Sequence, residues 1–286
     1  MKLLITLGAA SVAAALPLLG GNGDGACETK SAELSCCSAG GAGEATLASL
    51  RVPEPTFDPD STGGIKVAVK FDGDVPEALP KLEIGGEKSK GCDAKHEVKT
   101  EARQRIVNKN GGIANVVVMV EAKGVDPVIS EEPYVLDQRG CRFEPHVLVV
   151  PKGGTVRYLN SDEVNHNVHS FAKKNDPVNK NVAGGSREEQ KFEKDEVIEV
   201  KCDIHPWMQS WIYVTDAARF GVTDADGNYE LKGLPPGDYT VSYWHETLGK
   251  GKSEETVTVA AGASAPLELK VGEKKKKSGR GRGRKR

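Results

Sequence analysis

Apolar and polar residues alternate in short runs along most of this chain, and turn-forming residues separate the runs. Residues 65–71 and 197–201 alternate with the period of two that is typical of strands with one buried face. Apolar runs at residues 113–120 and 146–150 predict further strands, and turn signals such as residues 235–237 (Pro-Pro-Gly) stand between such runs. The pattern predicts an all-β protein.

Length and composition agree with this prediction. The chain has 286 residues, which suggests about two domains, and it is rich in glycine (33) and proline (15) but poor in aromatic residues (5%). Residues 1–22 begin with Met-Lys and continue as an apolar run, which predicts a secretory signal segment and a periplasmic or other extracytoplasmic location, with membrane anchoring as an alternative. The expected divisions are a signal segment (1–22), a flexible linker (23–63), a first β domain (64–216), a smaller second one (217–272) and a tail (273–286).

The charge of the chain is concentrated in that tail. The net charge is −2, but residues 273–286 hold nine basic residues and one acid, so that the rest of the chain is strongly acidic. Such a run predicts a disordered segment. In an extracytoplasmic setting its partners would be an anionic envelope polymer, lipid headgroups or the acidic body of another copy, and we expect no nucleic acid. A solvated tail without a partner is the alternative.

One short loop holds three residues of metal-binding types. Cys202, His205 and Met208 supply a thiol, an imidazole and a thioether, directly after an alternating strand and before a second predicted strand at residues 211–214. A trigonal copper site with a weak axial thioether needs one more imidazole. The segment that contains His166 and His169 can provide it. Because three positions along a strand separate these two histidines, they should point to opposite faces, and only one can serve.

The ligand types favour copper. A thiolate and two imidazoles also suit zinc, but a thioether such as Met208 is a poor zinc ligand and a familiar axial copper ligand. The chemistry expected is one-electron transfer rather than substrate turnover, so we do not expect an enzyme. The alternatives are a copper carrier or storage protein, and a structural or carbohydrate-contacting envelope module with a vestigial metal site.

The same residues resemble a known family. Cys-x-x-His-Pro-aromatic-Met at residues 202–208 resembles the ligand loop of amicyanin-type or plastocyanin-like blue copper proteins, and residues 155–169 resemble the cupredoxin strand and first ligand loop. The resemblance covers roughly residues 134–216. It implies a Greek-key sandwich with one type 1 copper held by His166, Cys202, His205 and axial Met208, with His169 not ligating. It also implies a redox partner such as a c-type cytochrome or a dehydrogenase.

Two other segments carry resemblances. Residues 222–243 resemble the carboxypeptidase regulatory-like (transthyretin-like) β-sandwich module, which implies a smaller C-terminal sandwich. Residues 64–125 resemble the β-rich segment that precedes the copper motifs in some envelope proteins, and we expect this segment to pack on the copper-binding sandwich.

Five cysteines remain besides Cys202: Cys27, Cys36, Cys37, Cys92 and Cys141. An oxidising compartment favours disulfides. The pairs Cys92 with His96 and Cys141 with His146 also invite a second metal site, but their spacings are unlike those of zinc motifs. A Cys92–Cys141 disulfide is therefore the favoured interpretation, with the two histidines as ordinary polar residues.

Overall fold

The computed structural model describes residues 57–58, 60–94 and 96–272. The signal segment predicted at 1–22, most of the linker predicted at 23–63 and the basic tail at 273–286 lie outside these residues. The predicted all-β class is confirmed, since the described residues form strands and a single 3₁₀ turn at Glu87–Ser89. None of their helical segments is long and apolar enough to cross a membrane.

The first sandwich consists of two sheets formed between residues 134 and 215. One sheet has the order β4-β3-β6-β9, with β4 (Phe143–Glu144), β3 (Tyr134–Gln138), β6 (Thr155–Asn160) and β9 (Arg187–Lys191). The other has the order β5-β11-β10-β7-β8, with β5 (Val147–Pro151), β11 (Gln209–Thr215), β10 (Glu196–Lys201), β7 (His166–Ser170) and β8 (Asn179–Val182).

Alternation along the strands creates the core of the first sandwich. Along β6, every second residue is buried, and Val156 and Tyr158 point into the core. Ile198 and Val200 on β10 and Ile212 on β11 meet them from the other sheet. Each strand therefore gives one face to the interior, as the period of two predicts.

The second sandwich includes strands from both ends of the described chain. Its sheets have the orders β13-β1-β18, β12-β2-β15-β16 and β14-β17. Their bounds are β1 (Gly63–Phe71), β2 (Val117–Val120), β12 (Arg219–Val222), β13 (Asn228–Leu234), β14 (Gly237–Tyr239), β15 (Val241–His245), β16 (Gly249–Lys252), β17 (Val257–Val259) and β18 (Ser264–Val271).

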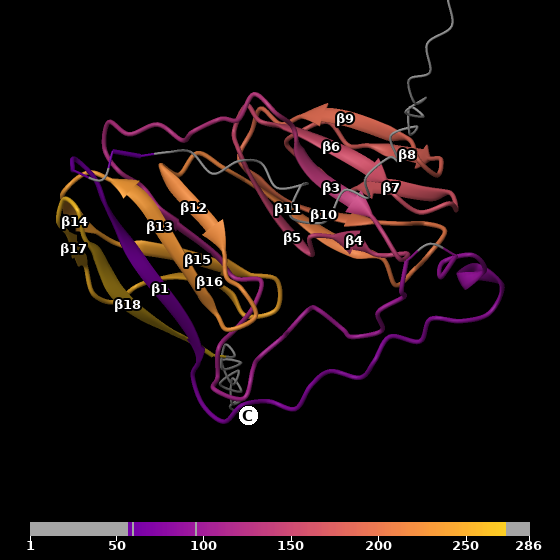
Figure 1. The fold of residues 1–286 in the computed structure, drawn as a ribbon, viewed down its shortest axis with the longest axis horizontal. Helices are drawn as coiled ribbons and strands as arrows, with labels where there is room; N and C mark the ends of the chain where they lie inside the picture. Colours follow the sequence, from indigo (N-terminus) through magenta and orange to yellow (C-terminus); the bar gives the residue numbers. More distant parts are fainter. Residues whose placement is uncertain (1–56, 59, 95, 273–286) are drawn as a thin grey trace, which may run out of the picture. The chain divides into compact units, whose positions relative to one another are not determined.

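The predicted division at 64–216 and 217–272 is therefore corrected. Strand β1 pairs antiparallel with β13 and parallel with β18, and β2 pairs with β12 and β15. Figure 1 shows β1 between β13 and β18. Ile65, Val67 and Val69 enter one core with Leu231 and Val241, so β1 and β2 complete the second sandwich rather than extend the first. The first sandwich is an insertion between β2 and β12.

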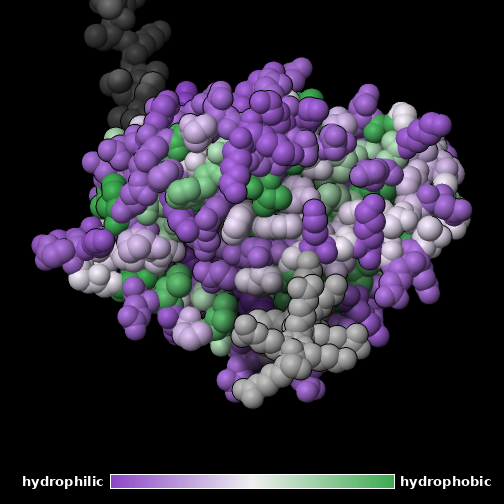
Figure 2. Space-filling view, turned by 180° about the vertical axis from the view of Figure 1, so that it is seen from behind, coloured by the Kyte–Doolittle hydropathy of each residue, from purple (hydrophilic) through white to green (hydrophobic). Residues whose placement is uncertain are grey.

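A third apolar cluster joins the two sandwiches. It contains Val117 and Met119 of β2, Val147 and Val149 of β5, and Ala217. On the surface, large hydrophobic residues are exposed at only six described positions: Val75, Val128, Ile129, Phe171, Val197 and Ile204. Figure 2 accordingly shows a face that is mainly hydrophilic, with apolar residues in separate small patches.

Candidate metal centre

Strand β10 carries Cys202 to the interior. Ile198 and Val200 point into the core, and the period of two continues to Cys202, which is only 2% exposed. The chain then turns back, and the antiparallel pair Lys201 and Gln209 joins β10 to β11 at the base of the loop. The strand, loop and return strand predicted from the sequence are thus present.

Backbone hydrogen bonds fix the shape of this ligand loop, residues 202–208. The N–H of Cys202 donates to the carbonyl of Met208 at 3.3 Å, and the N–H of Met208 donates to the carbonyl of His205 at 2.9 Å. Met208 is 1% exposed and belongs to the core cluster of the first sandwich. The loop therefore buries three of the predicted ligands without a helix or a disulfide of its own.

Three of the predicted ligands meet. His166 begins β7, and its Nδ1 lies 2.9 Å from Nδ1 of His205, while Sγ of Cys202 lies 3.6 Å from the same His205 nitrogen. The ligand atoms of the three residues all lie within 4.8 Å of one another. His166 and His205 are 0% and 3% exposed, so the cluster is closed to solvent. Two imidazoles and a thiol thus converge on one buried point, which is the arrangement a soft metal ion requires.

His169 lies apart from this cluster. Its Nδ1 faces the carboxylate of Asp203 at 3.0 Å, and its ring stacks on Phe171 with 4.2 Å between ring centroids. Its side chain is 29% exposed, whereas His166 on the same strand is fully buried. The two histidines occupy opposite faces of β7, as their spacing predicts.

Asp162 holds the outer edge of His166, a role that sequence analysis missed. Its Oδ2 lies 2.8 Å from Nε2 of His166. Burial disfavours the charged form of Asp162, but hydrogen bonds from His166, Cys141 and Gly140 outweigh it and lower the pKa of the carboxyl. Because the carboxylate accepts a hydrogen bond from Nε2, the neutral form of His166 presents the lone pair of its Nδ1 to His205 and Cys202.

The surroundings of Cys202 favour its thiolate. Burial opposes ionisation, but hydrogen bonds from His166, His205 and the backbone N–H groups of Asn167 and His205 lower the pKa of the thiol to about 6. The two N–H groups approach Sγ to 3.3 Å and 3.4 Å. For His166, burial alone would lower the pKa, whereas Asp162 and Cys202 raise it above its usual value. A thiolate is the form that binds metal.

Cys92 and Cys141 form the disulfide that the sequence favoured. Its Cys141 sulfur lies 4.0 Å from Nε2 of His205, which the sequence did not indicate. The two histidines that invited a second site have other contacts. Nε2 of His96 lies 3.2 Å from the carbonyl oxygen of Ser161. His146 pairs with the carboxylate of Glu246 in the second sandwich.

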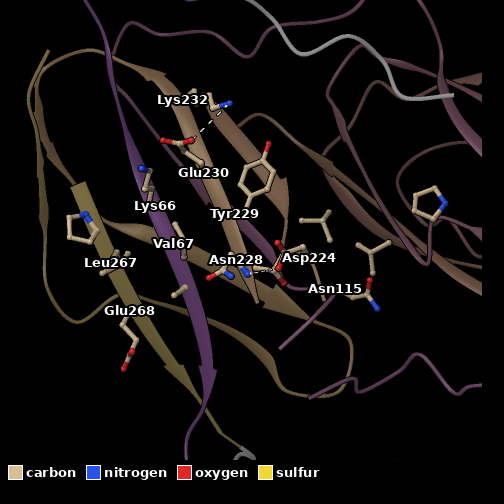
Figure 3. Close-up of a pocket in the computed structure, with 16 residues that line it drawn as sticks. Lys66, Val67, Asn115, Asp224, Asn228, Tyr229, Glu230, Lys232, Leu267 and Glu268 are labelled. Carbon is tan, nitrogen blue, oxygen red and sulfur yellow. Dashed lines mark hydrogen bonds and ion pairs between the residues drawn. The ribbon is translucent and has the colours of Figure 1, made fainter. Parts of the chain in front are cut away.

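One groove among the described residues lies away from this cluster. It has a volume of about 950 Å³ and lies over β13, β1 and β18, as Figure 3 shows. Charged side chains of both signs line it, among them Lys66 and Glu268 and the pair of Glu230 and Lys232 at 4.0 Å. None of its lining residues is a histidine or a cysteine, and none belongs to the cluster of His166, Cys202 and His205.

No protein-family model and no curated protein matches the chain. Solved structures match parts of it. The "Cu-containing nitrite reductase (NirK) from Thermus scotoductus SA-01" is 25% identical, with a TM-score of 0.29, over 34% of this chain and 25% of the reductase. The "Novel Purple Cupredoxin from Nitrosopumilus maritimus" is 31% identical, with a TM-score of 0.23, over 26% of this chain and 82% of that protein.

A reduced Cu(I) form of an amicyanin mutant is 19% identical, with a TM-score of 0.28, over 34% of this chain and 98% of amicyanin. These matches are to copper proteins, but each covers 34% of this chain or less at a low TM-score. The assignment of function therefore rests on the geometry of the cluster. The resemblance of the C-terminal strands to the carboxypeptidase regulatory-like module stays a prediction.

Proposed function

We propose that this chain is an extracytoplasmic copper protein that transfers single electrons. The observation that carries the proposal is the convergence of two imidazole Nδ1 atoms and a thiol sulfur in one buried cluster. His166, Cys202 and His205 would hold one copper ion, and the thioether of Met208 would be its weakest ligand. A bound copper ion would supply the one-electron chemistry by cycling between Cu(I) and Cu(II).

The residues around the cluster suit electron transfer better than substrate turnover. The three converging side chains are at most 3% exposed, so a substrate has no open path to them. The backbone hydrogen bonds of residues 202–208 and the contact of Asp162 with His166 restrain the ligands, which limits their movement when charge changes. The buried surroundings exclude water. These features favour a protein that is not an enzyme.

The disulfide supports an oxidising compartment, because disulfides persist outside the cytosol. The partner we propose is a redox protein such as a c-type cytochrome or a dehydrogenase. The basic residues after Gly272 would add a second, electrostatic contact with an anionic envelope polymer.

The test begins with the full-length protein loaded with Cu(II). We expect an intense thiolate-to-copper absorption in the visible range and reversible one-electron reduction. Cys202→Ser should abolish the absorption because the thiolate is lost, and His166→Ala should abolish it because one imidazole is lost. The matched control is His169→Ala, three residues further along β7, which should keep most of the absorption.

Three results would contradict the proposal. A colourless wild-type protein in excess Cu(II) under oxidising conditions would exclude the type 1 site. Loss of the absorption in His169→Ala but not in His166→Ala would exclude the ligand assignment. Tight binding of Cu(I) with rapid exchange and no reversible redox couple would favour a copper carrier instead.

A further inference from the structure

The outer edge of His205 is covered by a disulfide. Its Nδ1 faces the cluster, so its Nε2 points away from it, and there Sγ of Cys141 lies at 4.0 Å. Cys92 and Cys141 are 1% and 0% exposed, and His205 itself is 3% exposed. The disulfide therefore lies where solvent or another molecule would otherwise reach the imidazole.

The turn that carries Cys141 also holds the other histidine. The N–H groups of Gly140 and Cys141 donate to the two carboxylate oxygens of Asp162, at 2.7 Å and 2.8 Å. The same carboxylate accepts a hydrogen bond from Nε2 of His166. Both turn residues have positive φ, 60° at Gly140 and 51° at Cys141. This conformation is uncommon for a residue other than glycine. It aims two successive N–H groups at one anion.

Cys141 thus connects to both imidazoles, through its sulfur to His205 and through its backbone and Asp162 to His166. A substitution at Gly140 would disturb this arrangement, since a Cβ there would lie 2.6 Å from the carbonyl oxygen of Glu97. The close approach shows that the turn packs directly against the chain segment that carries Cys92.

That segment, residues 90–94 and 96–103, is called here the covering segment. It has no strand of its own. Arg142 reaches it from the turn, donating to the carbonyls of Lys99 and Glu101 at 2.7 Å and 2.9 Å. In the other direction, Arg103 donates to the carbonyl of Phe143.

Other contacts also hold the covering segment. Arg103 pairs with Glu144 at 2.8 Å, His96 contacts the carbonyl of Ser161, and Val98 packs against the core of the first sandwich. On the turn itself, Trp207 of the ligand loop donates a hydrogen bond from Nε1 to the carbonyl of Cys141 at 3.0 Å. The disulfide is the covalent attachment among these contacts. It joins residues 49 positions apart in the sequence.

We propose that the Cys92–Cys141 disulfide closes the metal centre, and that metal exchange requires its opening. This inference rests on the proposed copper site. With the disulfide intact, the covering segment stays over His205 and the turn at Cys141 keeps Asp162 beside His166. A dithiol reductant opens it: the S–S bond breaks, Cys92 and Cys141 each gain a proton as thiols, and the dithiol becomes a disulfide in a balanced two-electron exchange. The covering segment then separates from the cluster.

The first experiment needs no metal. In the metal-free full-length protein, the rate at which iodoacetamide alkylates Cys202 is measured by mass spectrometry of the peptide that contains it. The wild-type protein with an intact disulfide is compared with the double variant Cys92→Ser/Cys141→Ser. We expect alkylation to be about tenfold faster or more in the double variant, because local opening then exposes the buried thiol.

A matched control separates local opening from general loss of stability. Val67 is 2% exposed in the core of the second sandwich and is not among the residues around the cluster. Val67→Ala should lower the thermal midpoint while leaving the alkylation rate of Cys202 unchanged. If the double variant does not fold, wild-type protein reduced with a dithiol and freed of it by gel filtration replaces it, and the same acceleration is expected.

The second experiment uses the copper-loaded proteins and follows release of Cu(II) to EDTA. Release should be about tenfold faster or more in the double variant, with the visible absorption of the bound form retained. Equal alkylation and equal release in a folded double variant would overturn the closure. A wild-type protein that binds no copper would overturn the proposed function alone, because the alkylation comparison still tests the closure.

Discussion

Asp162→Asn tests how far a residue that touches no metal controls the centre. The Asp162 side chain is 2% exposed, and it accepts three hydrogen bonds: from Gly140, from Cys141 and from Nε2 of His166. Asparagine has nearly the same shape but one acceptor oxygen in place of two. Its NH₂ group would therefore face at least one of these three donors.

These contacts determine the expected loss of stability and of copper affinity in Asp162→Asn. A hydrogen bond to a charged group contributes about 1.5–3 kcal/mol, and a buried donor left without an acceptor costs about 1–3 kcal/mol. Removal of a residue that orients a ligand typically lowers metal affinity by about 10–100-fold, which is about 1.4–2.8 kcal/mol. The negative charge of Asp162 would stabilise Cu(II) more than Cu(I), so its removal should raise the reduction potential.

The assay is competition for copper against a chelator of known affinity, followed by a redox titration of the visible absorption. The control is Asp137→Asn. Asp137 is also buried and accepts two hydrogen bonds from Ser161, but it has no contact with His166. A folded Asp162→Asn protein with the affinity and potential of the wild type would refute the reasoning, and so would an equal loss in both variants.

Two further predictions concern the second sandwich. Burial lowers the pKa of His245 to about 4 in the folded protein. An unfolded histidine titrates near a pH of about 6.5. As the pH falls from about 6.5 to 4, the unfolded state therefore binds a proton that the folded state does not, and the protein should lose about 3 kcal/mol of stability. His245→Gln should reduce this slope in urea denaturation at a series of pH values, and an unchanged slope would contradict the assignment. Glu246 accepts from Trp211 Nε1 at 2.8 Å and pairs with His146, so Glu246→Ala should cost about 3–5 kcal/mol. Glu246→Gln keeps the shape and an acceptor oxygen but loses the charge, so it should cost less; a loss equal to that of Glu246→Ala would contradict a contribution from the neutral hydrogen bonds.

The sequence predicted the strands well because their pattern is local. The alternation at residues 197–201 corresponds to β10, and the second half of the run at 113–120 corresponds to β2, Val117–Val120. Strand pairing is not local. β1 pairs in parallel with β18, nearly two hundred residues further along the chain, and no feature of residues 65–71 specifies that partner. The predicted packing of residues 64–125 on the copper-binding sandwich was wrong for β1 and β2 for this reason.

In the candidate centre, too, some contacts follow from spacing along the chain and others only from the fold. Cys202 and His205 lie on one loop, so their spacing alone brings them together. The role of Asp162 depends on a turn at residues 140–141 that belongs to a different part of the chain. Asp162 stands four residues before His166, a spacing that could have drawn attention to it, but only the fold places the N–H groups that hold its carboxylate.

The insertion of the first sandwich explains how the second supports the ligand loop. Along β11, the strand that follows the loop, Ile212 and Val214 point into the core of the first sandwich. Trp211 and Tyr213 point the other way, and each ring lies 5.5 Å from the ring of Trp244 on β15. The return strand is therefore packed on both faces. Since Glu246 also accepts a hydrogen bond from Nε1 of Trp211, a shift of the second sandwich would move the strand that begins one residue after Met208. The position of the return strand thus depends on Trp244 and Glu246 of the second sandwich as well as on the core of the first.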